Sequence, residues 1–359
     1  MTGRERVVAA MRRQQPDRVP FDFSFGFARA SLRDFRRRYG VTDPFAYFET
    51  DARGVGLAPT RLHVDRTAYH AELPAGAVLD EWGIAHRLPD RADPCHRHLS
   101  GITSPMAALD SVRAVGDYPL PDIDAVYRYE HLPAQVCAYH DCGLAVCASM
   151  ACTILEVAAY LRGTAELLID LVDRPEIAEV LLGRIVDRRV VQARRFAECG
   201  ADVLVTGDDV ATQRGLLMSV ALWRRWILPR LERVIAAARE ARSDILIFYH
   251  GDGDMSAIVP DLIGAGVDIL NPVQPDCMDL AALKHRYGDR LAFWGGIGTH
   301  TLLTRGTPDD VRREVRERLE AGAAGGGLLL APTQMIGPEV PWENVEALVE
   351  AVRELGRYP

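Results

Sequence analysis

The residues best suited to chemistry in this sequence come directly after an apolar run. Residues 244–249 are rich in Ile and Phe, and the run stops at His250, which Asp252 and Asp254 follow. Such a run is typical of a strand buried on both faces of a parallel sheet, and parallel α/β folds build their sites at the carboxyl ends of strands. Because alternate residues of an extended chain share a face, we expect His250 and Asp252 on the same face. They could form an acid/base pair or provide two ligands of one metal ion.

Acids, amides and one thiol follow five other predicted strands. These candidates are Asp22, Glu156, Asp208, Asp209, Gln213, Asn271, Cys277 and Gln334. Because the strands of a barrel end at one common mouth, we expect these side chains to share a site with the histidine. Structural roles stay open for several of them. Asp208 or Asp209 could cap the segment that follows, and Glu156 could be an ordinary first-turn acid of a helix. Asn271 could form a turn, and Cys277 could be a small buried residue.

Apolar patterning predicts the elements that position these residues. Eight runs are predicted strands: residues 18–23, 53–58, 144–149, 202–207, 244–249, 267–273, 291–297 and 327–332. Amphipathic stretches are predicted helices: residues 4–14, 175–199, 220–241, 255–264, 279–286, 308–320 and 342–355. Thr307, Pro308 and the two acids after them are typical of a capped helix start. The alternation of the two kinds of element predicts an α/β fold, a (β/α)8 TIM barrel with an elaborated N-terminal region.

The elaboration is residues 60–142, which separate the second and third predicted strands and include a predicted hairpin around residues 80–83. We find no linker, low-complexity tract or internal repeat, so we expect a single domain over residues 1–359. Seven cysteines in a long chain without a secretory signal indicate reduced thiols.

Composition narrows the classes of function. The 359 residues are 48% hydrophobic and 26% charged, with a formal net charge of −8, which is ordinary for a globular protein. An acidic chain without a basic face is a poor partner for nucleic acid or an anionic membrane. No apolar run approaches the ~18 residues of a membrane-spanning helix, and the N-terminus lacks the apolar segment of a signal peptide. We therefore expect a cytoplasmic protein. The sequence motifs of nucleotide-binding enzymes and serine hydrolases are absent.

Several motifs, taken in order, resemble the uroporphyrinogen decarboxylase superfamily. They lie at residues 250–254, 260–263, 266–275, 293–297, 306–308, 330–332 and 341–345. The resemblance covers residues 140–359 well and the N-terminal third loosely, and it implies a (β/α)8 barrel with a deep cleft at the strand carboxyl ends. The superfamily contains decarboxylases of uroporphyrinogen. It also contains methyltransferases that move methyl groups between corrinoid proteins, methylated substrates and thiols, commonly with zinc.

The chain departs from both branches of this superfamily. The decarboxylases carry an Arg-rich segment at the first strand, whereas Arg29 is the only basic residue of residues 21–29 here. A substrate with many carboxylates needs several fixed cations. The thiol methyltransferases are similar in having His-x-Cys at strand five and Cys after strand eight, all three on zinc. Asp252 and Gln334 stand at the two cysteine positions, which makes a harder set of donor atoms.

The residues and the resemblance together predict a methyltransferase. It would demethylate a small O- or N-methyl substrate and pass the methyl group to a corrinoid protein that supplies the cobalamin. The predicted catalytic residues are His250, Asp252 and Glu156, and the predicted ligands of a zinc ion are His250, Asp252 and Cys277. The predicted substrate-binding residues are Asp22, Asp208, Asp209, Gln213, Asn271 and Gln334. The resemblance also implies a homodimer.

Two other classes of function stay open. One is a decarboxylase or lyase of a small carboxylic acid or a tetrapyrrole, in which Arg29, Arg61 or Arg214 would hold the carboxylate. The other is a barrel that binds a corrinoid or tetrapyrrole without catalysis. Within the enzyme hypotheses, a metal-free pocket in which His250 does acid/base work is the alternative to a metal site.

Overall fold

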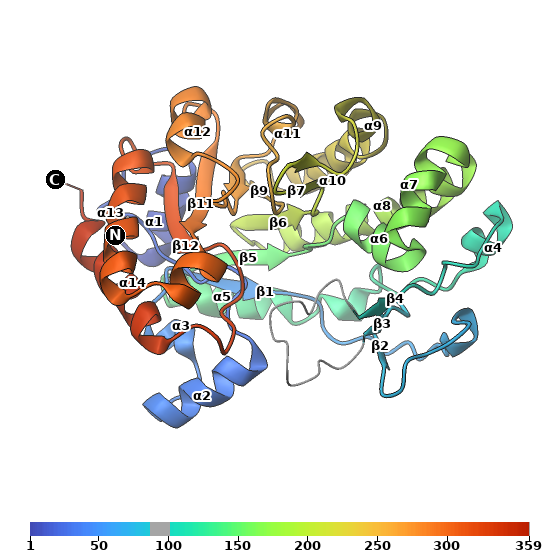
Figure 1. The fold of residues 1–359 in the computed structure, drawn as a ribbon, viewed down its shortest axis with the longest axis horizontal. Helices are drawn as coiled ribbons and strands as arrows, with labels where there is room; N and C mark the ends of the chain where they lie inside the picture. Colours follow the sequence, from blue (N-terminus) through green and yellow to red (C-terminus); the bar gives the residue numbers. More distant parts are fainter. Residues whose placement is uncertain (87–100, 359) are drawn as a thin grey trace.

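A curled sheet of seven parallel strands lies at the centre of the molecule, in the order β1-β5-β6-β9-β10-β11-β12 (Figure 1). The computed structural model describes residues 1–86 and 101–358 of the chain. The strands are β1 (Ala52–Val55), β5 (Ala145–Ser149), β6 (Val203–Gly207), β9 (Leu246–His250), β10 (Ile269–Asn271), β11 (Ala292–Ile297) and β12 (Leu328–Pro332). Each overlaps a predicted strand, so the prediction of an α/β fold with a parallel sheet is confirmed.

The first predicted strand, residues 18–23, lies between the two edges of this sheet. Phe21 forms a parallel bridge with Leu330 of β12, and the N–H of Leu330 donates to the carbonyl of Pro20 at 3.1 Å. On the other side, the N–H of Asp51 donates to the carbonyl of Phe21 at 3.0 Å. The segment therefore pairs with β12 on one side and with the residue before β1 on the other.

Helices cover the outer face of the sheet (Figure 1). They are α5 (Leu132–Asp141), α8 (Pro175–Glu198), α10 (Leu228–Ala241), α11 (Val259–Ala265), α12 (Leu280–Tyr287), α13 (Pro308–Gly322) and α14 (Trp342–Leu355). The prediction of one helix over residues 220–241 is wrong, because the chain breaks at Ile227 into α9 (Val220–Trp226) and α10. Pro229 explains the break, since proline has no N–H and clashes with the preceding turn. No helix in the described part of the chain is long and apolar enough to cross a membrane.

Side chains of β9 alternate between two apolar layers. Leu246 and Phe248 belong to a cluster formed by strand residues and α1, which fills the inside of the curled sheet. Ile247 and Tyr249 belong to the larger cluster between the sheet and the helices. Since side chains on a strand alternate between faces, His250 continues the inner series, at the end of the strand and next to the sheet interior.

Helix α1 (Gly3–Met11) covers the N-terminal end of this interior. Its buried Val7, Ala10 and Met11 complete the inner apolar cluster. The helix starts with a capping box: the Thr2 side chain accepts from the N–H of Glu5, and the Glu5 side chain accepts from the N–H of Thr2. The carboxyl ends of the strands, where His250 lies, are at the opposite end.

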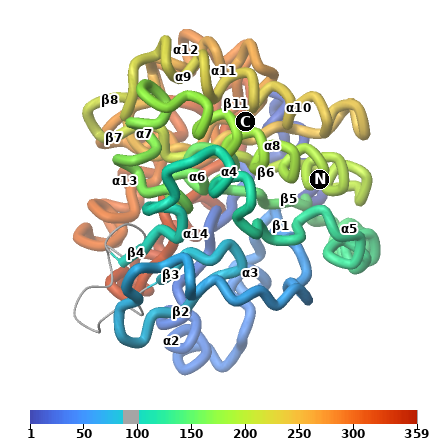
Figure 2. The backbone as a smooth tube through the Cα atoms, turned by 90° about the vertical axis from the view of Figure 1, so that its right-hand side faces the viewer, coloured from blue at the N-terminus to red at the C-terminus, as the bar shows by residue number. Residues whose placement is uncertain are grey.

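The remaining helices and the predicted elaboration pack around this core. The helices are α2 (Arg29–Tyr39), α3 (Pro44–Tyr47), α4 (Val112–Asp117), α6 (Leu155–Arg162) and α7 (Thr164–Asp173). A small antiparallel sheet of β2 (Val78–Leu79), β3 (Ala85–His86) and β4 (Ile102–Thr103) contains the predicted hairpin, whose turn Asp80 holds by accepting from the N–H groups of Trp82 and Ile84. Both views place this sheet on the side of the molecule away from α11 and α12 (Figure 2).

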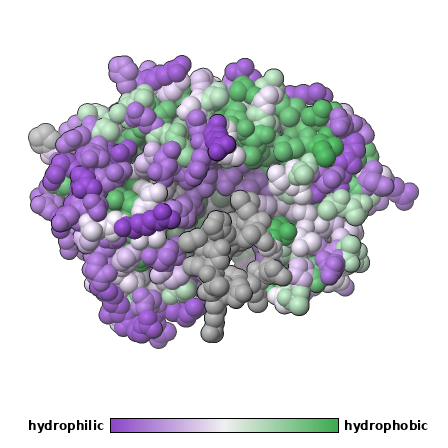
Figure 3. Space-filling model, in the orientation of Figure 1, coloured by the Kyte–Doolittle hydropathy of each residue, from purple (hydrophilic) through white to green (hydrophobic). Residues whose placement is uncertain are grey.

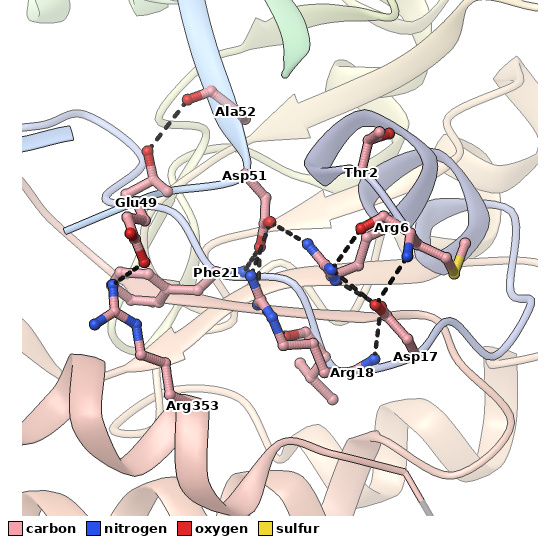
Figure 4. Close-up of polar contacts among 12 residues, drawn as sticks. Thr2, Arg6, Asp17, Arg18, Phe21, Glu49, Asp51, Ala52 and Arg353 are labelled. Atoms are coloured by element: carbon pink, nitrogen blue, oxygen red, sulfur yellow. Dashed lines mark hydrogen bonds and ion pairs between the residues drawn. The ribbon is translucent and has the colours of Figure 1, made fainter. Parts of the chain in front are cut away.

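A buried charge network fixes residues 18–23 against β1 (Figure 4). Asp51 is 3% exposed and pairs with Arg6 at 2.6 Å and Arg18 at 3.0 Å. Its Oδ2 also accepts from the N–H of Phe21 at 2.9 Å. Arg6 reaches further to Asp17 at 2.7 Å. One carboxylate thus ties α1, the 18–23 segment and the start of β1 together.

Candidate functional site

Three polar residues at or just beyond the ends of β6 and β9 come together at the carboxyl end of the sheet. His250 Nε2 lies 3.5 Å from Asp209 Oδ1 and 3.8 Å from Asp252 Oδ1. One donor atom of each residue lies within 4.8 Å of the other two. Ligand atoms around a tetrahedral ion such as Zn²⁺ are roughly 3.4 Å apart, because each lies about 2.1 Å from the metal. The Asp209–His250–Asp252 cluster therefore has the dimensions and the donor atoms of a metal site.

The register of the strands explains how these side chains meet. Gly207 on β6, His250 on β9 and Asn271 on β10 are paired neighbours. Gly207 has a φ of +150°, and a Cβ there would lie 2.4 Å from the carbonyl oxygen of His250. Only glycine allows this approach without strain. β6 and β9 can therefore run close together where the site begins.

Asn271 orients the imidazole of His250. Its Oδ1 lies 2.8 Å from His250 Nδ1, and its Nδ2 donates to the carbonyl of Trp294 at 2.8 Å. Because the amide NH₂ is committed to that carbonyl, the amide oxygen faces the ring and His250 Nδ1 carries the proton. Nε2 then faces the two aspartates, and it is the ring nitrogen that a metal-ligating histidine in this arrangement offers. Asn271 is fully buried, and its contacts are with the histidine and the backbone.

Two glutamine amides hold the carboxylate of Asp252. Gln274 Nε2 donates to Oδ1 at 3.0 Å, and Gln334 Nε2 donates to Oδ2. The Gln274 carbonyl oxygen in turn accepts from the N–H of Gly253 at 2.8 Å. Burial raises the pKa of Asp252 to about 6, against the opposing effect of His250. Gln334 therefore reaches the cluster by orienting Asp252.

Glu156 and Asp208 lie next to each other with different contacts. Asp208 is buried and accepts from the N–H groups of Ile154 and Glu156, both at 2.9 Å, so it caps the start of α6. Burial raises the pKa of Asp208 to about 7. The Glu156 side chain turns toward the cluster: Oε2 lies 3.4 Å from the N–H of Asp209, and Oε1 accepts from the Tyr160 hydroxyl.

The other predicted site residues lie around the cluster. Cys277 Sγ is 3.6 Å from Gln274 Oε1, outside the Asp209–His250–Asp252 cluster. Asp209, a predicted substrate-binding residue, takes the third position of the cluster. Two adjacent aspartates after a strand carry no signal that tells the helix cap, Asp208, from the member of the cluster, Asp209. The backbone turn after Gly207 decides between them.

Two cavities adjoin the cluster. Cavity one has a volume of about 450 Å³, and its walls include Asp22, Phe25, Arg53, Gly54, Phe248 and Trp294. Cavity two has a volume of about 500 Å³, and its walls include Leu155, Glu156, Leu168, Asp209, Gln213 and Asp252. Phe25 joins cavity one to the cluster, because its ring packs edge-on against His250 with centroids 4.7 Å apart. Cavity two therefore reaches the cluster directly through Asp209 and Asp252, and cavity one is linked to it through Phe25.

Apolar side chains surround the outer part of cavity two. Leu167 and Leu168 of α7 line it, as does Leu217. On the same helix Ile169 and Val172 are exposed, at 44% and 64%. Figure 3 shows apolar surface at the upper right of the molecule, where Figure 1 places α7 and α9. An apolar surface at the edge of a polar site is typical of a contact region for a ligand or a protein.

The buried carboxyl group of Asp22 should make the stability of the folded protein depend on pH. Burial raises the pKa of Asp22 from 3.8 to about 7, so the folded protein keeps a proton that the unfolded chain releases. The protonated carboxyl therefore stabilises the folded protein fully below about pH 4. This contribution to the free energy of unfolding, roughly 4 kcal/mol in total, is lost as the pH rises to about 7. Between pH 5 and 8 the free energy of unfolding should fall less in Asp22→Asn than in the natural protein. Urea denaturation at both pH values measures this, and equal falls in the two proteins would contradict it.

Comparison with known proteins places the chain in a family. Residues 144–355 match the family described as uroporphyrinogen decarboxylase (URO-D). The chain belongs to this family. The resemblance stated from the motifs around His250 is therefore confirmed, and the Asp209–His250–Asp252 cluster lies within the matched residues.

Relatives within the URO-D family differ in the reactions for which they are named. The chain is 25% identical over 279 residues to the methylcobamide:CoM methyltransferase MtaA of Methanosarcina barkeri, covering 75% of this chain and 72% of that protein. It is also 25% identical over 375 residues to a uroporphyrinogen decarboxylase of Xanthomonas campestris pv. campestris, covering 99% and 100%. A solved methyltransferase from Methanosarcina mazei superimposes with a TM-score of 0.70 at 21% identity over 99% of both chains. The fold is thus shared with that methyltransferase, and membership of an enzyme family is established.

Proposed function

We propose that this protein is a methyltransferase that demethylates a small O- or N-methyl compound and passes the methyl group to a corrinoid protein. The observation that carries the proposal is the Asp209–His250–Asp252 cluster with its oriented imidazole. The MtaA relative, named for methyl transfer from methylcobamide to coenzyme M, supports the reaction class. The donor set of two carboxylates and one imidazole is harder than a thiolate set and favours substrates that present oxygen or nitrogen.

A zinc ion fits this donor set, with Asp209, His250 and Asp252 as its ligands. When bound, it would act as a Lewis acid for the charge that develops on the leaving oxygen or nitrogen. Asn271 keeps His250 Nε2 available, and the glutamine amides on Asp252 fix the direction of its carboxylate. The Glu156 carboxyl at the wall of cavity two is placed to handle the proton that the leaving atom takes up.

The proposal extends to the fold, in which residues 18–23 would serve as the eighth strand of a (β/α)8 barrel. The contacts of this segment with Leu330 of β12 and with Asp51 support it. Active sites of such barrels lie at the strand carboxyl ends, which is where His250 lies.

Metal content and methyl transfer test the proposal directly. Purified protein should contain about one zinc per chain, and it should methylate a reduced corrinoid protein when given an O- or N-methyl donor. Removal of the metal with a chelator should abolish the transfer, and zinc should restore it. Elemental analysis and the absorbance change of the corrinoid measure the two results. Full activity of metal-free protein would instead favour acid/base work by His250 alone.

Decarboxylation of a small carboxylic acid is a second candidate that one observation favours. Arg53 and Asp22 both line cavity one, and burial raises the pKa of Asp22 to about 7. A cation could hold a carboxylate while a protonated acid supplies the proton that replaces carbon dioxide. Arg29, Arg61 and Arg214 are not among the residues that line either cavity. Release of carbon dioxide without methyl transfer would decide for this candidate.

A further inference from the structure

We propose that cavity one binds a small aryl carboxylate, with its ring among aromatic side chains and its carboxylate on Arg53. The role of this ligand as the methyl donor rests on the proposed function, whereas its binding does not require a metal or a corrinoid. The cavity volume of about 450 Å³ lies within the usual range for small-molecule sites.

The walls of cavity one are suited to a flat apolar ring. Phe25, Phe45, Phe248 and Trp294 line it. Phe248 and Trp294 already contact each other edge to face, with ring centroids 5.5 Å apart. Aromatic rings attract a further ring through burial of area and through offset or edge-to-face geometry. Phe25 also packs against His250. A ring held in cavity one would therefore lie beside Phe25, which contacts the Asp209–His250–Asp252 cluster.

Arg53 is the cation of this cavity, and most of its guanidinium is free. Its Nη1 donates to Thr50 Oγ1 at 2.6 Å and to the carbonyl of Ala52 at 2.8 Å, and its carbon lies 5.6 Å from the centroid of the Phe45 ring. Within the described residues, Arg53 forms no ion pair with an acid. The remaining N–H groups present the planar edge that binds carboxylates in a bidentate way.

Two acids share the walls of cavity one, and the buried one, Asp22, does not oppose a carboxylate at pH 6, whereas Asp43 is exposed to solvent, which screens its charge. Burial raises the pKa of Asp22 to about 7, so its carboxyl is mostly neutral at pH 6 and can donate a hydrogen bond. Asp43 uses its Oδ1 to accept from the N–H of Ala46 at the start of α3, 3.1 Å away. A carboxylate ligand thus meets the positive charge of Arg53 without a buried negative charge beside it.

Small residues in the sheet keep cavity one open. Gly54 lies in β1, and a Cβ added there would meet nothing within 4 Å. Gly54 and Ser149 of β5 are exposed although both lie in strands of the central sheet. A Cβ at Gly54 would enter this space without displacing a neighbour, and a larger side chain starts from there. The position therefore offers a way to fill the cavity while the fold is retained.

Calorimetric titration with benzoate and its neutral isostere benzamide, at pH 6 with a chelator present, tests the proposal. Benzoate should bind the natural protein at least about tenfold more tightly than benzamide, the effect of one charge-assisted hydrogen-bonded pair. In Arg53→Gln this preference should disappear through loss of benzoate affinity alone, while Arg53→Lys should keep part of it. Gly54→Leu should lose both ligands, and its circular dichroism and melting temperature check the fold.

Matched variants separate this site from others. Arg61→Gln removes a guanidinium that stacks on Tyr127 outside both cavities, and benzoate binding should not change. Equal affinities of benzoate and benzamide in the natural protein, or benzoate binding that survives Gly54→Leu, would overturn the proposal. Because the titration excludes metal, its failure would leave the methyltransferase proposal standing. Absence of methyl transfer would equally leave the titration result intact.

Discussion

Replacing His250 with alanine should abolish metal binding and lower methyl transfer by roughly 10²–10⁴-fold. His250 provides the only nitrogen of the Asp209–His250–Asp252 cluster, and Asn271 holds its Nε2 toward both aspartates. The two carboxylates left in the variant are a weak, unfavourably charged pair. Elemental analysis after dialysis and single-turnover transfer to a reduced corrinoid protein measure both effects.

Two further variants calibrate this result. His285→Ala removes an exposed histidine on α12 and should leave zinc content and rate unchanged. Asn271→Ala keeps Nε2 but frees the ring to rotate, so zinc affinity should fall about 10–100-fold, as for other partners that orient a ligand. A His250→Ala protein with full activity would show that the chemistry takes place elsewhere.

Replacing Asp51 with alanine should lower the free energy of unfolding by about 3–5 kcal/mol. The carboxylate is 3% exposed and serves Arg6, Arg18 and the N–H of Phe21. Its loss leaves buried positive charge and an unsatisfied backbone donor, which are among the most costly changes in a protein interior. Urea denaturation followed by circular dichroism measures the change.

Asp244→Ala is the matched control for this prediction. Asp244 also pairs with arginines, Arg12 and Arg242, but its side chain is 55% exposed. Exposed pairs contribute about 0–1 kcal/mol because water and salt screen them. Equal destabilisation by the two variants would show that burial of Asp51 is not what makes it important. Ligand binding should suffer as well in Asp51→Ala, since the segment that Asp51 holds carries Asp22 and Phe25 into cavity one.

The central sheet could be predicted because its strands are buried on both faces. Such strands read as continuous apolar runs, as at residues 202–207 and 291–297, and each run ends at a polar residue or glycine. Glu156 is expected in the first turn of a helix and lies in the first turn of α6, whereas α7 is not predicted, because a break at Gly163, with a φ of +90°, divides one apolar stretch into two short helices. Residues 18–23 pair only through isolated bridges, since their place depends on contacts with segments far along the chain.

The site could be predicted only as far as strand geometry reaches. His250 is the last residue of β9, so its inward direction follows from the alternation of the strand. Asp252 lies beyond the strand, and its place depends on a turn in which its N–H donates to Asp209 Oδ1 at 2.9 Å. Asn271 carries a polar side chain at a fully buried position, a role that composition and spacing do not distinguish from substrate binding.

Helix α1 gives the sheet interior a closed floor. Its Val7, Ala10 and Met11 pack among the inward side chains of the strands, while the cluster lies at the carboxyl ends of the strands, with cavity two beside it. A methyl donor and a cobalamin-carrying partner would then both approach the site from the carboxyl end of the sheet. In the proposed methyl transfer, the small molecule would bind before the partner docks above it, and the product would leave after the partner has dissociated. The proposed enzyme would therefore bind its two substrates in a fixed order.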